Sequence, residues 1–233
     1  MLSLKILLRA LRAGELKTIF ISLCLSVAVV AAVSIFAERI EKAIVNESKE
    51  LLGSDFIVKS SKPIPQVWIE YAVNRNIDVS RTLSFASVVF FNENMHLAYI
   101  KAVESNYPLR GSILTSQLPF TYDVKQMEEF TSGPKVGEIW VESRLLPILN
   151  VEIGSQIDIG ESSLTITKIL IEEPEGPSFS ILGSRILMNF ADVESTNVVQ
   201  PGSRVTHNLL VASSKESDIN SYVSWVTGKM SPH

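Results

Sequence analysis

The sequence predicts an α+β protein: one amino-terminal transmembrane helix continues into a stalk and leads to a two-lobed extracytoplasmic α+β domain. Three observations predict this fold class. Residues 18–37 contain no charged side chain, apolar residues keep helical spacing as far as Leu52, and short strand-like and helix-like segments alternate over the remainder.

The segment 18–37 supplies 20 consecutive, mostly apolar positions between Lys17 and Glu38. At about 1.5 Å of rise per residue it is about 30 Å long, which matches the hydrocarbon thickness of a bilayer. The longest uncharged apolar run downstream, residues 83–91, is short enough to be a strand, so we predict a single span. A cleaved signal peptide is the alternative, but this run exceeds the usual apolar region of about 7–15 residues.

Basic residues precede the span, with Glu15 as the only acid among them. This asymmetry predicts that the amino terminus lies in the cytoplasm and that the main domain lies outside it. We expect a protein of the bacterial inner membrane whose main domain is periplasmic. Within residues 1–17, leucines follow one helical face and cations another, which predicts an amphipathic helix on the membrane surface. An ordinary basic flank is the alternative. The cations predicted to contact the lipid bilayer are Lys5, Arg9, Arg12 and Lys17.

The charge of the remaining chain is acidic. Of 21 basic and 25 acidic residues, 17 basic and 24 acidic follow the span, which gives that part a formal charge of −7. Such a domain is a poor candidate for binding nucleic acid. The single cysteine, Cys24, falls inside the span, so no disulfide is predicted.

Residues 38–53 are predicted to form the stalk helix, which ends at Gly53 because glycine suits the left-handed conformation of a helix end. The domain, 54–233, follows, and its lobes are predicted to divide near 131–137. We expect the strand 77–91 to be broken near Ser84. The other strands are expected at 55–59, 95–103, 138–141, 156–159, 164–171, 185–189 and 207–212, and helices at 65–74, at 142–149 and from about 217.

No motif for catalysis, cofactor binding or a metal site is recognisable. A phosphate-binding loop and a Gly-x-Ser-x-Gly elbow are both missing, and the three histidines, His96, His207 and His233, lack metal-site spacing. The acidic run 172–175 contains a proline and is followed by Gly176-Pro177, which predicts a solvated loop. We therefore predict no enzymatic activity, no cofactor and no metal for the chain itself.

Several motifs resemble one protein family. The run Leu11-Arg12-Ala13-Gly14-Glu15-Leu16-Lys17-Thr18 resembles the entry to the first transmembrane helix of FtsX/MacB/LolC-type permeases. Further blocks resemble the YbbP-type members, and together they cover nearly the entire chain. These blocks are Lys101-Ala102-Val103, residues 107–111, residues 140–146, Val151-Glu152-Ile153-Gly154, residues 185–189 and residues 200–205.

The resemblance implies a MacB-like periplasmic core and the permease subunit of an ABC transporter. A separate YbbA-like ATPase would hydrolyse ATP, and the cargo would be lipophilic or derived from the envelope. Family members are several times longer, so this chain is expected to be an amino-terminal fragment of a permease. Tyr107 and Arg110 are predicted at an interface, either between the lobes or with another periplasmic protein. The alternative is that residues 107–111 form only a turn between a strand and a loop, since proline and glycine set turn geometry there.

Two rival functions remain open at this stage. One is a single-span adaptor whose periplasmic domain only binds a protein partner. The other is an anchored envelope enzyme, which would need a polar pocket with perturbed acid or base residues.

Overall fold

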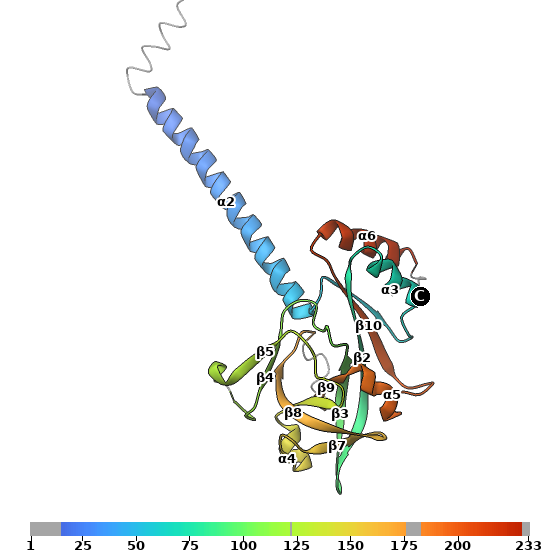
Figure 1. Cartoon of the computed structure of the whole chain (residues 1–233). Helices are drawn as coiled ribbons and strands as arrows, with labels where there is room; N and C mark the ends of the chain where they lie inside the picture. The colour runs from blue at the N-terminus through green and yellow to red at the C-terminus, as the bar shows by residue number, and fades with distance from the viewer. Residues whose placement is uncertain (1–14, 122, 176–182, 230–233) are drawn as a thin grey trace, which may run out of the picture. The chain divides into compact units, whose positions relative to one another are not determined.

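The computed structural model describes residues 15–121, 123–175 and 183–229 (Figure 1). The chain divides into two compact units, Met1–Glu47 and Ser48–His233. The described part of the first unit is helical and belongs to α2 (Glu15–Leu52), which continues into the second unit. Within α2, the segment Lys17–Leu52 contains an 18-residue window of mean hydropathy 2.7. It is the one helix of the described residues that is long and apolar enough to cross a membrane.

The second unit is a mixed α+β domain, which confirms the predicted fold class. Its α-helices are short and stand between strands: α3 (Gln66–Val73), α4 (Leu145–Leu149), α5 (Val193–Thr196) and α6 (Glu216–Thr227). Its strands, in chain order, are β1 (Phe56–Ser60), β2 (Asp78–Phe91), β3 (Asn94–Val103), β4 (Ile113–Ser116), β5 (Met127–Phe130), β6 (Glu138–Glu142), β7 (Gln156–Ile159), β8 (Ser162–Glu172), β9 (Ser184–Asn189) and β10 (Val205–Ala212).

Six of these strands close into a ring. The hydrogen-bonded order β2-β3-β9-β6-β8 is completed by β7, which pairs with both β8 and β2. Side chains alternate between the two faces of a strand, so every second residue of the ring points inward. The largest apolar cluster fills this interior, and α4 contributes Leu145, Leu146 and Leu149 to it.

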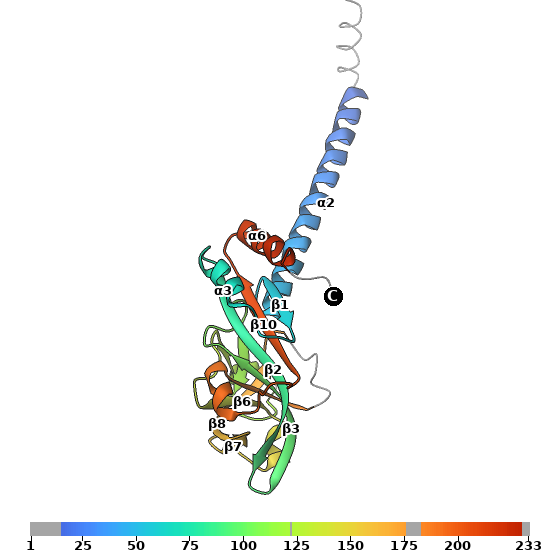
Figure 2. The same ribbon diagram turned by 90° about the vertical axis from the view of Figure 1, so that its right-hand side faces the viewer.

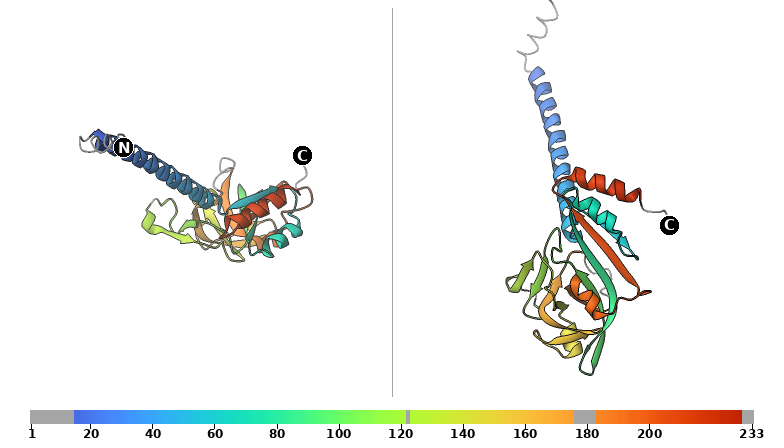
Figure 3. Two further views of the ribbon diagram at one scale, coloured as in Figure 1. Left: turned by 90° about the horizontal axis from the view of Figure 1, so that it is seen from above. Right: turned by 45° about the vertical axis from the view of Figure 1, so that its right-hand side comes forward.

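A second layer forms where β10 inserts between β1 and β2. Helices α3 and α6 lie side by side near these strands (Figures 1 and 3). They enclose an apolar cluster that includes Val58, Leu209 and Tyr222. Strand β10 and helix α6, near the end of the chain, therefore form one layer with β1 and α3, which come early in the domain. The division into lobes near 131–137 stays a prediction.

Two sequence expectations are corrected, and two strands were missed. Strand β2 is unbroken at Ser84, because that residue pairs with Thr206 on one side and Lys101 on the other. Figure 2 shows β2 as one continuous strand. The helix expected from residue 142 begins only at Leu145, since Glu142 still belongs to strand β6. Strands β4 and β5 were not predicted, because four residues each are too few to show a clear alternation.

Candidate functional site: the junction at the end of helix α2

Helix α2 ends at Leu52, directly before Gly53, and its role as a stalk stays a prediction. Gly53 has φ +67° and donates its N–H to Glu50 O at 3.1 Å, while Ser54 N donates to Lys49 O at 3.2 Å. These two bonds satisfy carbonyls that a helix end otherwise leaves unpaired. A third comes from outside the helix, because Glu175 N donates to Leu51 O at 2.6 Å.

The turn Tyr107-Pro108-Leu109-Arg110-Gly111 packs against this helix end. Leu109 N and Arg110 N both donate to Gly53 O, at 2.9 and 3.0 Å. Gly111 has φ +69°, and a Cβ atom at this position would lie 2.9 Å from Glu50 O. The close approach therefore requires glycine at residue 111.

Asp55 joins three segments at the same place. Its carboxylate accepts hydrogen bonds from Arg110 Nη2 at 2.9 Å and Ser213 N at 2.9 Å, and Lys49 Nζ lies 3.5 Å away. The Asp55 side chain is 4% exposed. A buried carboxylate needs such partners to offset its desolvation, so Asp55 fixes the last turn of α2 to the turn 107–111 and to the end of β10.

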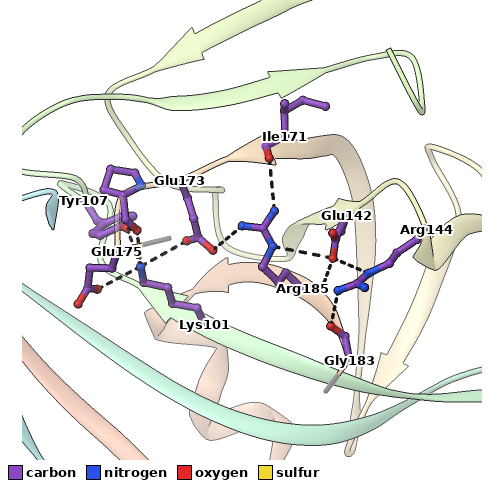
Figure 4. Close-up of polar contacts among 10 residues, drawn as sticks. Lys101, Tyr107, Glu142, Arg144, Ile171, Glu173, Glu175, Gly183 and Arg185 are labelled. Atoms are coloured by element: carbon purple, nitrogen blue, oxygen red, sulfur yellow. Dashed lines mark hydrogen bonds and ion pairs between the residues drawn. The ribbon is translucent and has the colours of Figure 1, made fainter. Parts of the chain in front are cut away.

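Lys101 of β3 is the centre of a buried cluster beside this junction (Figure 4). Its Nζ donates to Tyr107 Oη at 2.6 Å and to Pro174 O at 3.0 Å, and Tyr107 Oη donates to the same carbonyl at 2.8 Å. Two carboxylates face Nζ, Glu175 at 3.1 Å and Glu173 at 3.3 Å. Lys101 therefore holds the segment 173–175, whose Glu175 N caps α2.

A chain of alternating charges continues from this cluster across the sheet (Figure 4). Glu173 faces Arg185 Nη1 at 3.9 Å, and Arg185 Nε faces Glu142 at 3.8 Å. Glu142 in turn accepts from Arg144 Nε at 2.9 Å. The charges link the end of α2 with Arg144, the residue immediately before α4.

The acidic run 172–175 is therefore not the solvated loop that the sequence predicts. The side chains of Glu173 and Glu175 are 8% and 7% exposed. The sequence-based prediction was wrong because it considered only the local proline and glycines, whereas Lys101 neutralises these carboxylates from a strand about 70 residues earlier.

Burial and charge shift two pKa values in the cluster. Burial alone disfavours the charged ammonium of Lys101, but Glu173, Tyr107 and Glu175 outweigh it, so the pKa of Lys101 lies well above its ordinary value. Burial raises the pKa of the Tyr107 hydroxyl above its usual range, although Lys101 acts in the opposite direction. Both groups are therefore protonated at neutral pH.

These shifts make stability dependent on alkaline pH. Because both pKa values are higher in the folded than in the unfolded chain, the folded state keeps protons that the unfolded chain releases. We expect the free energy of unfolding to fall as pH rises above about 10, by up to about 1.4 kcal/mol per pH unit for each group. Denaturant titrations between pH 7 and 12 measure this slope.

The matched variant is Tyr107→Phe. In this variant we expect the free energy of unfolding to fall less steeply with rising pH. Part of the dependence should remain, because Lys101 is still present and because burial raises the pKa of Tyr222 to about 12. An alkaline slope identical to that of the unaltered protein would contradict this assignment.

The structure brings two of the predicted site residues together. Tyr107 is fully buried within the cluster, and Arg110 is half-buried between Asp55 and Ser213. Lys17 lies exposed on α2, and the other three predicted membrane-surface cations, Lys5, Arg9 and Arg12, fall outside the described residues. Roles for all six at an interface or membrane surface stay predictions.

Sequence reasoning missed the charged residues of the cluster. The one available signal was Lys101 itself, a single charge in the apolar strand 98–103. A lysine there must either face solvent or find buried partners, and the local pattern does not say which. The described residues contain no group of three His, Cys, Asp or Glu able to hold a metal ion.

Comparison with known proteins identifies a relative of the chain by sequence similarity. No protein-family model matches it. It is 32% identical over 225 residues, or 96% of its length, to the protein described as "Uncharacterized ABC transporter permease YbbP" of Escherichia coli (strain K12). The predicted resemblance to YbbP-type permeases is confirmed. The aligned region is 26% of YbbP, so the chain spans about a quarter of the length of this relative.

Two solved structures are similar to the chain in part, each at 12% identity. The extracellular domain of the noncanonic ABC-type transporter YknZ from Gram-positive bacteria has a TM-score of 0.45, covering 70% of this chain and 79% of its own. The periplasmic region of MacB from Actinobacillus actinomycetemcomitans has a TM-score of 0.46, covering 79% of this chain and 88% of its own.

Proposed function

We propose that this chain forms the amino-terminal part of the permease subunit of an ABC transporter. The observation that carries the proposal is the 32% identity to YbbP over 96% of the chain. A separate YbbA-like ATPase would hydrolyse ATP in the cytoplasm, and the domain after α2 would move in the periplasm. As the family resemblance implies, the cargo would be lipophilic or envelope-derived.

The proposed topology is a single span with the amino terminus in the cytoplasm. Lys17 stands at the start of the apolar stretch of α2, in agreement with the basic flank expected on the cytoplasmic side. The part of α2 beyond the span would form the stalk. Reporter fusions after Lys229 test this topology, and activity of a cytosolic reporter there would contradict it.

The proposed mechanism is transmission of motion through a continuous helix into the junction. Helix α2 is unbroken over 38 residues, and its last turn is held by Glu175, the turn 107–111 and Asp55. A helix end fixed at several points passes on rotation or bending, whereas a flexible linker would absorb it.

A pair of insertions between Ile40 and Glu41 tests this mechanism. Four alanines lengthen α2 by about 6 Å and keep it helical, whereas four glycines disfavour helix by about 4 kcal/mol in total. In the complete permease assembled with its ATPase, we expect four glycines to abolish the ATP-dependent movement of the domain. Four alanines should retain at least about half of it, because a helical insertion still transmits motion.

The measurement is an ATP-dependent fluorescence change from a label at Val124→Cys, in a Cys24→Ser background. Val124 is 77% exposed, so a label there should not disturb packing. Copurification of the ATPase is the control and should be equal for both insertions. A full signal from the four-glycine variant would contradict transmission through α2.

The alternative is a single-span adaptor whose domain only binds a protein partner. It is favoured by exposed apolar side chains on the domain, among them Leu118 at 51% and Phe120 at 58%. An adaptor would show no ATP-dependent movement in the assay above and would keep its partner with or without nucleotide.

A further inference from the structure

One face of the domain carries a hollow that the junction does not use. It has a volume of about 720 Å³ and lies between the segment 117–120, which follows β4, and the segment 146–155, which begins in α4. Helix α4 stands at the end of the domain away from α3 and α6 (Figure 1). The walls are mostly apolar and consist of Pro119, Phe120, Leu146, Pro147, Val151 and Ile153.

Phe120 is the unusual residue of this hollow. Its backbone has φ +56°, a conformation that a bulky side chain rarely adopts, and its side chain is 58% exposed. Ser143 Oγ accepts a hydrogen bond from Phe120 N at 3.1 Å, so the backbone is held in place from the α4 side. A large aromatic ring kept exposed on a strained backbone does not contribute to the core, which points to a binding role.

The rim of the hollow indicates the charge of its occupant. Its polar members are Gln117, Asn150, Glu152 and Ser155, of which Glu152 alone is charged. Glu152 is exposed and makes no ion pair among the described residues. The sequence after the span also carries a formal charge of −7. Both the local and the overall charge favour a cationic occupant.

The walls of the hollow are exposed to solvent, which favours a protein segment over an acyl chain as its occupant. Phe120 and Pro147 are themselves exposed, so an acyl chain lying between them would stay in contact with water along much of its length. A single large apolar side chain presented by a protein needs only a shallow site, and polar groups around it complete such an interface.

We propose that this hollow binds a protein partner through a large apolar side chain that is followed by a lysine or arginine, with Phe120 contacting the former and Glu152 the latter. The inference goes beyond the proposed transport function. It concerns binding by this chain alone and can fail or succeed independently of coupling to an ATPase.

The test uses two acetylated peptide amides, Gly-Leu-Phe-Arg-Gly and Gly-Leu-Phe-Glu-Gly, with 4-fluorophenylalanine as the aromatic residue. Fluorine NMR measures their binding to the full chain in lipid nanodiscs, with empty nanodiscs as the blank. We expect saturable binding, stronger for the arginine peptide by about three- to tenfold, since an exposed charge pair contributes little more than that.

Three variants of the hollow and one control variant make the test specific. Phe120→Gly removes the ring and suits the positive φ, and Phe120→Asn does the same without loosening the chain as much. Each should weaken binding by about tenfold or more, as expected for the loss of an aromatic anchor. Glu152→Gln should bring the ratio of the dissociation constants of the two peptides close to one. Val124→Ala, an exposed apolar residue of the same β4–β5 connection that does not line the hollow, should change nothing.

Circular dichroism confirms that each variant is folded. Binding of neither peptide, or binding that the Phe120 and Glu152 variants leave unchanged, would overturn the proposal. A short-chain phospholipid, dihexanoylphosphatidylcholine, is titrated in parallel below its micellar concentration. Saturable binding of this lipid that depends on Phe120 and excludes the arginine peptide would also overturn it, in favour of a lipid site.

Discussion

Replacing Lys101 by methionine should lower the free energy of unfolding of the domain by about 3–5 kcal/mol, the range found when one partner of a buried ion pair is removed. Lys101 is 6% exposed, and it is the nearest cation to two carboxylates that are themselves buried. Methionine has a similar shape but no charge, so Glu173 and Glu175 would be left in the interior without their main partner. Urea unfolding followed by tryptophan fluorescence measures the loss.

Lys59→Met is the matched control. Lys59 faces the same Glu175, at 3.6 Å, but its side chain is 62% exposed, so we expect a loss below about 1 kcal/mol. In the double variant Lys101→Met/Glu173→Gln, one of the unpaired charges is gone, and at least about 1 kcal/mol of the loss should be recovered. Equal losses for Lys101→Met and Lys59→Met would contradict a buried cluster centred on Lys101.

Gly111→Ala should lower the free energy of unfolding by about 2–3 kcal/mol or more. The substitution combines an unfavourable φ of +69° with a Cβ atom only 2.9 Å from the backbone oxygen of Glu50. Relief of that contact requires the turn 107–111 to move away from the end of α2. We therefore also expect faster hydrogen exchange at Leu109 N and Arg110 N, which both bond Gly53 O.

Gly202→Ala separates the effect of the positive φ from the effect of the close contact with Glu50 O. Gly202 also has a positive φ, +95°, but no atom lies within 4 Å of the added Cβ. We expect a loss of about 1 kcal/mol from backbone strain alone and no change in exchange at Leu109 and Arg110. If Gly111→Ala behaved like Gly202→Ala, the close contact between the turn and α2 would have to be abandoned.

The main local elements could be predicted from the sequence because their signals are local. The uncharged segment 18–37 and the helical spacing up to Leu52 gave the long helix, and Gly53 gave its end. Most strands were placed within a few residues, since side-chain alternation and turn residues lie within the strands and hairpins themselves. The hairpin between β2 and β3, with Asn92 and Glu93 at its turn, is an example.

The candidate site could be predicted only in part. Tyr107 and Arg110 were singled out, but their partners were not, because these partners are distant in the chain. Pro174 is 67 residues from Tyr107, and Asp55 and Ser213 are 55 and 103 residues from Arg110. The carboxylates of Glu173 and Glu175 resemble solvated charges in a local window. Whether a charge is buried depends on a counter-charge, and that counter-charge can come from any part of the chain.

By itself, the sequence determined the apolar helix, its length and end, the α+β class and the relationship to YbbP. Each of these follows from residues adjacent in the chain or from aligned residues. Only the tertiary structure decided that β7 closes a ring of six strands, that β10 inserts between β1 and β2, and that Lys101 neutralises the acidic segment beside α2. These features depend on pairings between distant segments, whose energies come from burial and charge compensation that no local pattern encodes.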